Sequence, residues 1–200
     1  MALRHIPNAA GAYEAGRGRL AGPVVAAAVI LPRGFDLEGI DDSKKLDAKT
    51  RLELEKRIKK KATWNVIAVD LDEIDELNIL WASMVGMRRA LSSLQRPFKC
   101  AYIDGNTLPR DLNFPAKPVV DGDAKVACIA AASILAKTER DRIMTRYAEQ
   151  YPEYGFEKHF GYSTPQHLAA LREHGPCALH RRSFQRIREY YDQPCLTFEA

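Results

Sequence analysis

The sequence predicts an α/β domain in which helices flank a mixed β-sheet, followed by a small helical C-terminal part. Short apolar stretches alternate along the chain with longer segments of helical period. The stretch from Pro23 to Leu31 is rich in Val, Ala and Ile, which is typical of a buried strand. The small residues at 130–133, Ala-Ala-Ala-Ser, indicate a helix packed closely on that sheet.

The elements follow one another in a regular order. We expect a first strand ending before Glu14, strands at 23–31, 64–71, 99–103 and 118–120, and helices at 48–60, 72–94, 124–150, 165–174 and 183–191. Residues 1–150 should form the main domain, and 151–200 a helical segment of the same globular unit.

Two of the helices carry clear start signals. Asp47 is expected to cap the helix 48–60, with Leu52, Leu54 and Ile58 partly buried. Asp72 is expected to cap the long helix after it. The apolar stripe of that helix is predicted to be core and not a cofactor site; it comprises Ile74, Leu77, Trp81, Met84, Arg88 and Leu91.

Composition places the chain among ordinary globular proteins, with 46% hydrophobic and 28% charged residues and a net charge of +4. The four cysteines are far apart and form no C-x-x-C pair, which disfavours a disulfide framework or a metal cluster. No apolar run is long enough to cross a bilayer, and residues 1–10 lack a signal-peptide core. We expect a cytoplasmic monomer with no membrane partner.

A glycine-rich turn, Gly16-Arg17-Gly18, connects the first strand to the apolar stretch. The glycines allow a ligand to approach the backbone N–H groups, and Arg17 adds a planar donor that suits phosphate oxygens. The turn matches neither a P-loop nor G-x-G-x-x-G. By itself it is more often a simple hairpin turn.

Three acids occupy comparable places near strand ends: Glu14, Asp104 and Asp123. Open α/β sheets build their sites at the carboxyl ends of strands. Clustered carboxylates need a cation, and oxygen ligands suit Mg²⁺ or Mn²⁺. For any single acid, a helix cap or a surface charge is the commoner explanation, and Asp123 is placed to cap the helix behind it.

The order and spacing of many motifs make the chain resemble bacterial ribonuclease HII, the type-2 ribonuclease H. The motifs are Glu14-Ala15-Gly16-Arg17-Gly18, Leu20-Ala21-Gly22-Pro23, Asp42-Ser43-Lys44-Lys45-Leu46, Glu76-Leu77-Asn78, Ile103-Asp104-Gly105-Asn106, Gly122-Asp123, Ile129 to Lys137, Arg140-Asp141, Tyr154-Gly155-Phe156, Gly161-Tyr162 and His180-Arg181-Arg182-Ser183-Phe184. The resemblance implies a ribonuclease-H-like fold. It also implies cleavage, on the 5′ side of a ribonucleotide, of RNA in RNA–DNA hybrids or of single ribonucleotides embedded in duplex DNA.

The resemblance also implies roles for individual residues. Glu14, Asp104 and Asp123 would be catalytic and would hold Mg²⁺ or Mn²⁺. Gly16, Arg17 and Gly18 would contact the backbone and the 2′-hydroxyl, which distinguishes RNA from DNA. Tyr162 would stack beneath the ribonucleotide sugar. Ser43, Lys44 and Lys45, with the basic helix after them, would contact the duplex.

Several positions depart from the family pattern. Tyr13 stands where the family has its first metal-binding aspartate, and a phenol, neutral at pH 7, is a poor Mg²⁺ ligand. Arg19 replaces a usual proline; the other departures are Asp41, Asp121 and Phe160. Asp121 would face the same side as Asp123 if the chain were extended there, and would then restore a negative charge.

The departures leave two hypotheses open. The first is a ribonuclease HII whose activity is intact or reduced by Tyr13. The alternative is a non-catalytic binder of RNA–DNA hybrids or ribonucleotide-containing duplexes.

Overall fold

The computed structural model describes residues 3–40 and 46–192. Its centre is a five-stranded mixed sheet with the order β3-β2-β1-β4-β5. Strands β1 (Ala9–Ala15), β2 (Val24–Ile30) and β3 (Thr63–Val69) form an antiparallel meander. Strands β4 (Cys100–Asp104) and β5 (Ala116–Val119) extend the sheet in parallel with β1. The predicted mixed sheet is confirmed.

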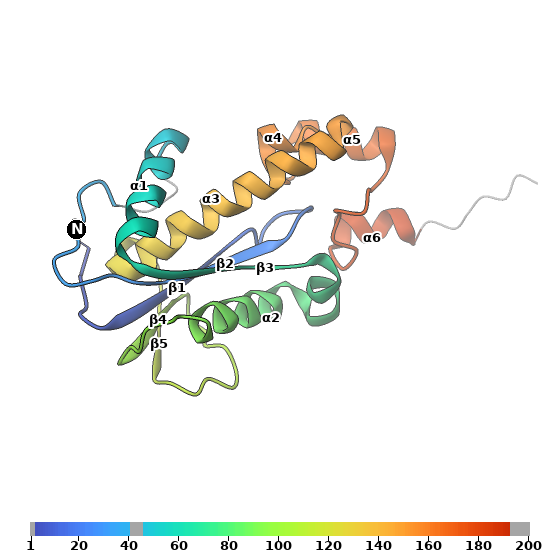
Figure 1. Ribbon diagram of the computed structural model, residues 1–200. Helices are drawn as coiled ribbons and strands as arrows, with labels where there is room; N and C mark the ends of the chain where they lie inside the picture. The colour runs from blue at the N-terminus through green and yellow to red at the C-terminus, as the bar shows by residue number, and fades with distance from the viewer. Residues whose placement is uncertain (1–2, 41–45, 193–200) are drawn as a thin grey trace, which may run out of the picture.

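Helices cover both faces of the sheet (Figure 1). Helices α1 (Ala48–Lys61) and α3 (Ala127–Gln150) lie on one face, and α2 (Leu71–Ser92) lies on the other. The short α4 (Phe156–His159), α5 (Pro165–His174) and α6 (Gln185–Tyr191) gather around the C-terminal end of α3. Across residues 3–40 and 46–192, no helix has the length and apolar character needed to span a membrane.

Small residues allow α3 to approach the sheet very closely. A Cβ atom placed on Gly11 of β1 would lie 2.3 Å from the carbonyl carbon of Cys128 in α3, so only glycine fits there. All seven residues of β2 are buried. The run of Ala and Ser at 130–133 is fully buried against this part of the sheet, as the sequence predicted.

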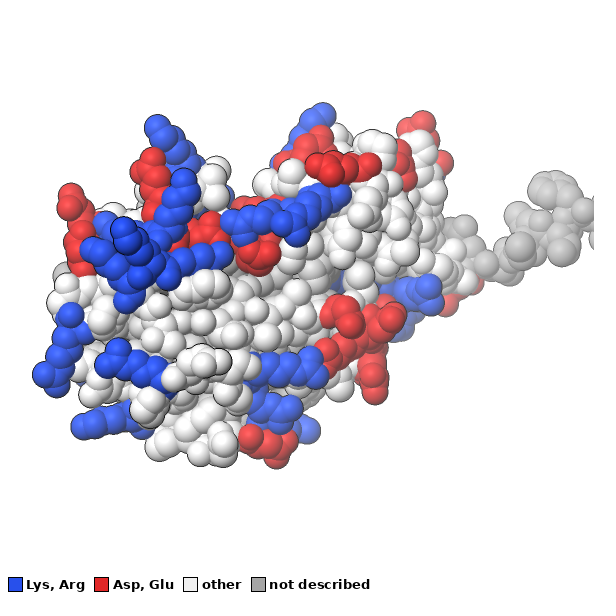
Figure 2. Space-filling model, viewed as in Figure 1, with Lys and Arg blue, Asp and Glu red and all other residues white. Residues whose placement is uncertain are grey.

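Helix α1 begins as expected, because the side chain of Asp47 accepts a hydrogen bond from the N–H of Thr50 at 2.7 Å. Leu54 and Ile58 are buried, but the expectation for Leu52 was wrong: it is 44% exposed. The last turn carries Lys59, Lys60 and Lys61. Figure 2 shows Lys and Arg side chains gathered over this region of the surface, at the upper left.

Helix α2 differs from the prediction in its start and its continuity. Asp70, not Asp72, caps it by accepting from the N–H of Glu73. Asn78 breaks the helix with a positive φ of 64°, and its side chain accepts from the N–H groups of Leu80 and Trp81. Asn78 therefore caps a second helical segment inside α2, because its short polar side chain tolerates the left-handed region.

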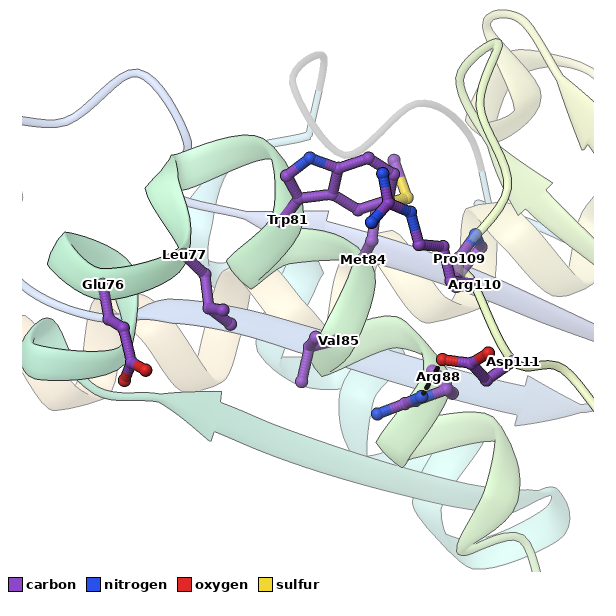
Figure 3. A pocket seen from close by; sticks show the side chains of 9 residues that line it. All are labelled: Glu76, Leu77, Trp81, Met84, Val85, Arg88, Pro109, Arg110 and Asp111. Carbon is purple, nitrogen blue, oxygen red and sulfur yellow. Dashed lines mark hydrogen bonds and ion pairs between the residues drawn. The ribbon is translucent and has the colours of Figure 1, made fainter.

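The predicted apolar stripe of α2 is fully buried at only three of its six positions. Ile74, Met84 and Leu91 are buried as expected. Leu77, Trp81 and Arg88 instead line an open cavity of about 320 Å³ between α2 and the loop at 109–111 (Figure 3). We call this the α2-face cavity.

The connection from β5 to α3 is also not as predicted. A short 3₁₀ turn (Gly122–Ala124) precedes α3, and Val126 is the residue before its first turn, so Asp123 does not cap α3. Asp121 has a left-handed backbone (φ 53°) and is not extended. Its side chain is 77% exposed and lies 3.9 Å from Lys125, whereas Asp123 is buried. The two acids therefore do not share a face.

Candidate active site

The register of the sheet places the acidic residues at one edge. In the parallel pair β1–β4, Ala12 lies opposite Ile103, so Glu14 and Asp104 come near neighbouring strand ends. Glu14 lies inside β1 and pairs with Ala26, so the expectation that the strand ends before it was wrong. In the pair β4–β5, Asp104 lies opposite Val119, and the chain then turns toward Asp123. This is the edge at which open α/β sheets form their sites.

Glu14 is held in a buried, charged environment. Its Oε1 accepts a hydrogen bond from Nη1 of Arg17 at 3.1 Å, and its side chain is only 9% exposed. Burial, opposed by Arg17 and assisted by the nearby charge of Asp104, raises the pKa of Glu14 to about 7. Burial therefore favours the neutral carboxyl group of Glu14 over the carboxylate.

Asp104 is oriented by the turn after β5. Its Oδ1 accepts a hydrogen bond of 2.7 Å from the N–H of Gly122. A Cβ atom on Gly122 would lie 3.1 Å from the same oxygen and 2.6 Å from Cδ1 of Ile129, so the close approach depends on glycine. Asp123, the next residue, is 4% exposed.

These acids offer hard oxygen donors, the chemistry that Mg²⁺ and Mn²⁺ prefer. Among residues 3–40 and 46–192, however, no three His, Cys, Asp or Glu side chains converge in an arrangement that could hold a metal ion. The donor chemistry fits a divalent cation, and the three-ligand geometry does not.

Tyr13 occupies the position at which the resemblance predicts a further metal-binding aspartate. It precedes Glu14 in β1, and successive strand side chains point to opposite faces. Its ring packs in the core between the sheet and α3, and it is 9% exposed. The position that would carry a further carboxylate in the family is filled by an aromatic ring with core contacts.

Most of the predicted substrate residues line one cavity of about 290 Å³, which we call the strand-end cavity. Its walls include Tyr13, Glu14, Gly16, Arg17, Gly18 and Tyr162. The structure thus brings together residues that lie nearly 150 positions apart in the sequence. Asp104 and Asp123 lie outside its lining. Ser43, Lys44 and Lys45 lie outside the described residues.

Two buried arginines hold the loop that forms this cavity. Arg181 donates hydrogen bonds to the carbonyl oxygens of Gly16 (2.8 Å), Arg17 (2.9 Å) and Gly22 (2.8 and 3.0 Å). Arg140 of α3 donates to the carbonyl oxygens of three further residues, Pro23, Ala21 and Phe160. Burial lowers the pKa of Arg181 to about 9 and that of Arg140 to about 10.

Arg140 and Arg181 both lie within motifs that resemble the family, but those motifs predicted no role for either residue. One signal was present for Arg140: it continues the spacing of the buried Ser133 and Ala136 along α3. No local pattern points to Arg181, since its partners lie about 160 positions away.

Three buried histidines support the backbone next to Tyr162. The N–H of Cys177 donates to Nδ1 of His180 (3.0 Å), so Nε2 of His180 carries the proton and donates to Nε2 of His167 (3.0 Å). His167 in turn donates from Nδ1 to the carbonyl oxygen of Tyr162 at 2.7 Å. His159 stacks on His167 with ring centroids 4.5 Å apart. Burial lowers the pKa of both His167 and His180 to about 4, so the network is neutral at pH 7.

The sequence profile of the family Ribonuclease HII matches residues 10–187. The chain belongs to the ribonuclease HII family. Members of this family are metal-dependent hydrolases of the ribonuclease H class, and the chain is an endoribonuclease of this type.

Individual relatives cover nearly the whole chain. It is 52% identical over 179 residues to the ribonuclease HII of Idiomarina loihiensis, and this alignment covers 89% of this chain and 95% of that protein. It is 55% identical over 183 residues to the ribonuclease HII of Burkholderia ambifaria, with 91% and 84% covered. Among solved structures, ribonuclease H2 from Pyrococcus horikoshii OT3 superposes with a TM-score of 0.75 at 26% identity, covering 91% of this chain and 96% of that one.

Proposed function

We propose that this ribonuclease HII cuts the RNA strand of RNA–DNA hybrids and single ribonucleotides embedded in duplex DNA, on the 5′ side of the ribonucleotide, and that Tyr13 slows the cut. The observation that carries this proposal is the strand-end cavity, in which Glu14, the Gly16–Gly18 loop and Tyr162 meet in a chain that matches the family along its length.

The proposed roles follow from the surroundings of each residue. The N–H groups and guanidinium of Gly16-Arg17-Gly18 bind the backbone and the 2′-hydroxyl at the junction. Tyr162, which is 50% exposed at the rim, carries the ribonucleotide sugar on its ring. Arg17 holds Glu14 by a hydrogen bond, and the turn at Gly122 orients Asp104.

Glu14, Asp104 and Asp123 are the proposed acidic residues of the reaction centre, and Mg²⁺ or Mn²⁺ the proposed ion. An ion held by these side chains would supply the positive charge that activates water and stabilises a leaving oxygen in phosphodiester cleavage. Compared with the aspartate of the family pattern, Tyr13 leaves this edge of the sheet with one negative charge fewer and with an aromatic ring instead. We therefore expect weak binding of the ion and slow turnover by the chain as it stands. The proposal takes the chain to act as a cytoplasmic monomer.

The test is cleavage of a labelled DNA duplex that contains one ribonucleotide, with Mg²⁺ and then Mn²⁺, beside the variant Tyr13→Asp. We expect Tyr13→Asp to cut at least ten-fold faster than the original chain. Equal rates would show that position 13 is not the missing ligand and would contradict the proposed slowing.

A second candidate function is a binder that does not cut. The observation that favours it is the lack, in the described part of the chain, of a three-donor metal arrangement. A chain that binds the junction duplex tightly but leaves it intact at every Mg²⁺ and Mn²⁺ concentration would establish this alternative. Metal-dependent turnover that disappears in Asp104→Asn would exclude it.

A further inference from the structure

Arg51 is a partly buried cation near the start of helix α1 that contacts two parts of the molecule at once. Its Nη1 donates a hydrogen bond of 2.6 Å to the carbonyl oxygen of Leu46, just before the helix. Its Nη2 lies 3.3 Å from Oδ2 of Asp141 on α3. The side chain of Arg51 is 13% exposed and that of Asp141 is 21% exposed. The guanidinium therefore ties the entry of α1 to helix α3.

Asp141 connects this tie to the strand-end cavity. It lines the cavity together with Glu14 and Arg17. Burial raises the pKa of Asp141, and four nearby cations oppose that shift: Arg51, Lys137, Arg140 and Arg19. Of these four, only Arg51 belongs to α1. The contact between Arg51 and Asp141 thus brings α1 to the wall of the cavity.

A second ionic contact lies one helical turn further along α1. Glu55, four residues after Arg51, is 4% exposed and accepts from Nη2 of Arg142 at 2.9 and 3.0 Å. Arg142 follows Asp141 directly on α3. The two pairs have opposite polarity, because α1 supplies the cation in one and the carboxylate in the other. A shift that brought Arg51 toward Arg142 would place like charges together, so the pairs favour one register of the two helices.

Such pairs contribute more to orientation than to stability. The cost of removing two charges from water offsets most of their attraction, so replacing both partners by neutral groups is often without effect on stability. Orientation matters for α1 because the helix carries a basic surface, with Lys59, Lys60 and Lys61 in its last turn (Figure 2). How α1 sits on α3 decides where this surface points.

We propose that Arg51 and Asp141 are positioning residues of the nuclease. Together they hold the start of α1 against the wall of the strand-end cavity, so that the basic surface of the helix meets a duplex bound there. Neither side chain touches the reacting atoms in this role. The role rests on the proposed function for its ligand, a duplex that contains a ribonucleotide, whereas the tie between the two helices does not.

The negative charge of Asp141 gives this role a distinctive sign. A carboxylate in the wall of a nucleic-acid site repels phosphate groups. If Asp141 acted through its charge alone, Asp141→Asn would strengthen duplex binding. If Asp141 holds α1 in place, the same change weakens it. The sign of the effect therefore separates positioning from simple repulsion.

The first experiment measures binding of a fluorescent DNA duplex with one ribonucleotide, without divalent metal, so that binding is independent of cleavage. We expect Arg51→Gln and Asp141→Asn each to weaken binding about five-fold. The double variant should bind no more weakly than either single variant, because both changes remove the same tie. Asp141→Glu, which keeps the charge, should restore part of the affinity.

The matched controls come from the α2-face cavity, where Arg88 and Asp111 form a pair of the same residue types at 3.4 Å (Figure 3). Arg88→Gln and Asp111→Asn should each change duplex affinity by less than about two-fold. Unchanged or stronger binding in Asp141→Asn would overturn the positioning role. Losses that add up in the double variant would also overturn it, since Arg51 would then contact the duplex by itself.

Thermal unfolding shows that the variants are folded. We expect the Tm of the double variant to lie within about 3 °C of the original value, whereas a merely structural pair would lower the Tm and leave the affinity of the folded molecules unchanged. If Arg51→Gln does not fold, Arg51→Lys replaces it. Lysine keeps the charge but lacks the planar fork that reaches both acceptors, so a smaller loss of affinity is expected.

A second experiment uses the protein alone and so separates the tie from the proposed function. Amide hydrogen exchange is followed in peptides that cover residues 46–54. We expect Asp141→Asn to speed exchange there by about three-fold or more, and Asp111→Asn to leave it unchanged. Unchanged exchange in Asp141→Asn would overturn the tie, whatever the duplex does. Faster exchange in a chain that does not bind the duplex would keep the tie and overturn the proposed function, and with it the ligand named here.

Discussion

The strand-end cavity, of about 290 Å³, and the α2-face cavity, of about 320 Å³, are similar in volume, and each has an arginine over an aromatic ring. In the α2-face cavity Arg88 pairs with Asp111 at 3.4 Å, and Glu76 adds a second acid (Figure 3). In the strand-end cavity basic side chains outnumber acidic ones, and Glu14 has a raised pKa.

The difference between the cavities teaches that volume and residue type do not identify a site. The strand-end cavity lies at the carboxyl ends of strands, where the chain must turn and leaves backbone groups directed outward. Arg140 and Arg181 hold the loop at 16–23 by donating hydrogen bonds to its carbonyl oxygens. The α2-face cavity lies between the side of a helix and the loop at 109–111, away from the carboxyl ends of the strands.

The largest effect should come from removing the support under the strand-end cavity. Arg181→Met leaves the carbonyl oxygens of Gly16, Arg17 and Gly22 without their donor, and we expect a loss of about 3–5 kcal/mol in the free energy of unfolding. Urea unfolding measures it. Arg182→Met, next in sequence and exposed, is the control and should change stability by less than about 0.5 kcal/mol. Equal losses would show that Arg181 does not hold the loop.

A slightly smaller effect is expected in the reaction itself. Asp104→Asn keeps the hydrogen bond from Gly122 and removes a charge, so turnover of a ribonucleotide-containing duplex should fall ~10²–10³-fold. Arg88→Gln, in the α2-face cavity, should leave turnover unchanged. A comparable loss of turnover in Arg88→Gln would show that the reaction also depends on the α2-face cavity, and would contradict its assignment to the strand-end side. Both variants are compared at equal Mn²⁺ concentration.

Acid should weaken the histidine support of Tyr162. The pKa of His167 and of His180 is about 4 in the folded chain, below the ordinary value of 6.5. The unfolded chain therefore binds more protons, and stability is lost as the pH falls from about 6.5 toward 4. Between pH 6.5 and 5.5 we expect these two groups to lower the free energy of unfolding by about 2 kcal/mol.

Urea unfolding across this pH range tests the assignment. His167→Gln should make the pH dependence about half as steep. His174→Gln, an exposed histidine of α5, should leave it unchanged. A pH dependence that His167→Gln does not alter would mean that His167 is not held neutral in the folded chain.

The smallest effect belongs to the α2-face cavity. Arg110→Gln removes the stacking of a largely exposed guanidinium on Trp81, which is worth about 0.5–1 kcal/mol. We expect a small decrease in Tm and no change in duplex affinity. A clear loss of duplex affinity in Arg110→Gln would show that the nucleic acid also contacts the α2-face cavity. The two cavities would then not differ in their role.

Local signals were enough for much of the fold and part of the site. The Asp47 cap, the buried strand β2, the close packing at 130–133 and the bounds of α5 follow from patterns within a few residues, because propensity, capping and periodicity are local. The order of motifs identified the family, and with it the fold and the type of reaction. The roles assigned to individual site residues remain predictions.

The tertiary structure decided what depends on distant partners. Part of the predicted core stripe of α2 lines a cavity because the loop at 109–111 lies opposite it, and the left-handed backbone at Asp121 separates that residue from Asp123. The contacts of Arg181 with the Gly16–Gly22 loop join residues about 160 positions apart, and the stacking of Arg19 on Tyr162 spans a similar stretch. The sequence by itself determined which elements form and which chemistry they carry. Only packing decided which charges are buried together, since burial and electrostatic surroundings are properties of the assembled chain.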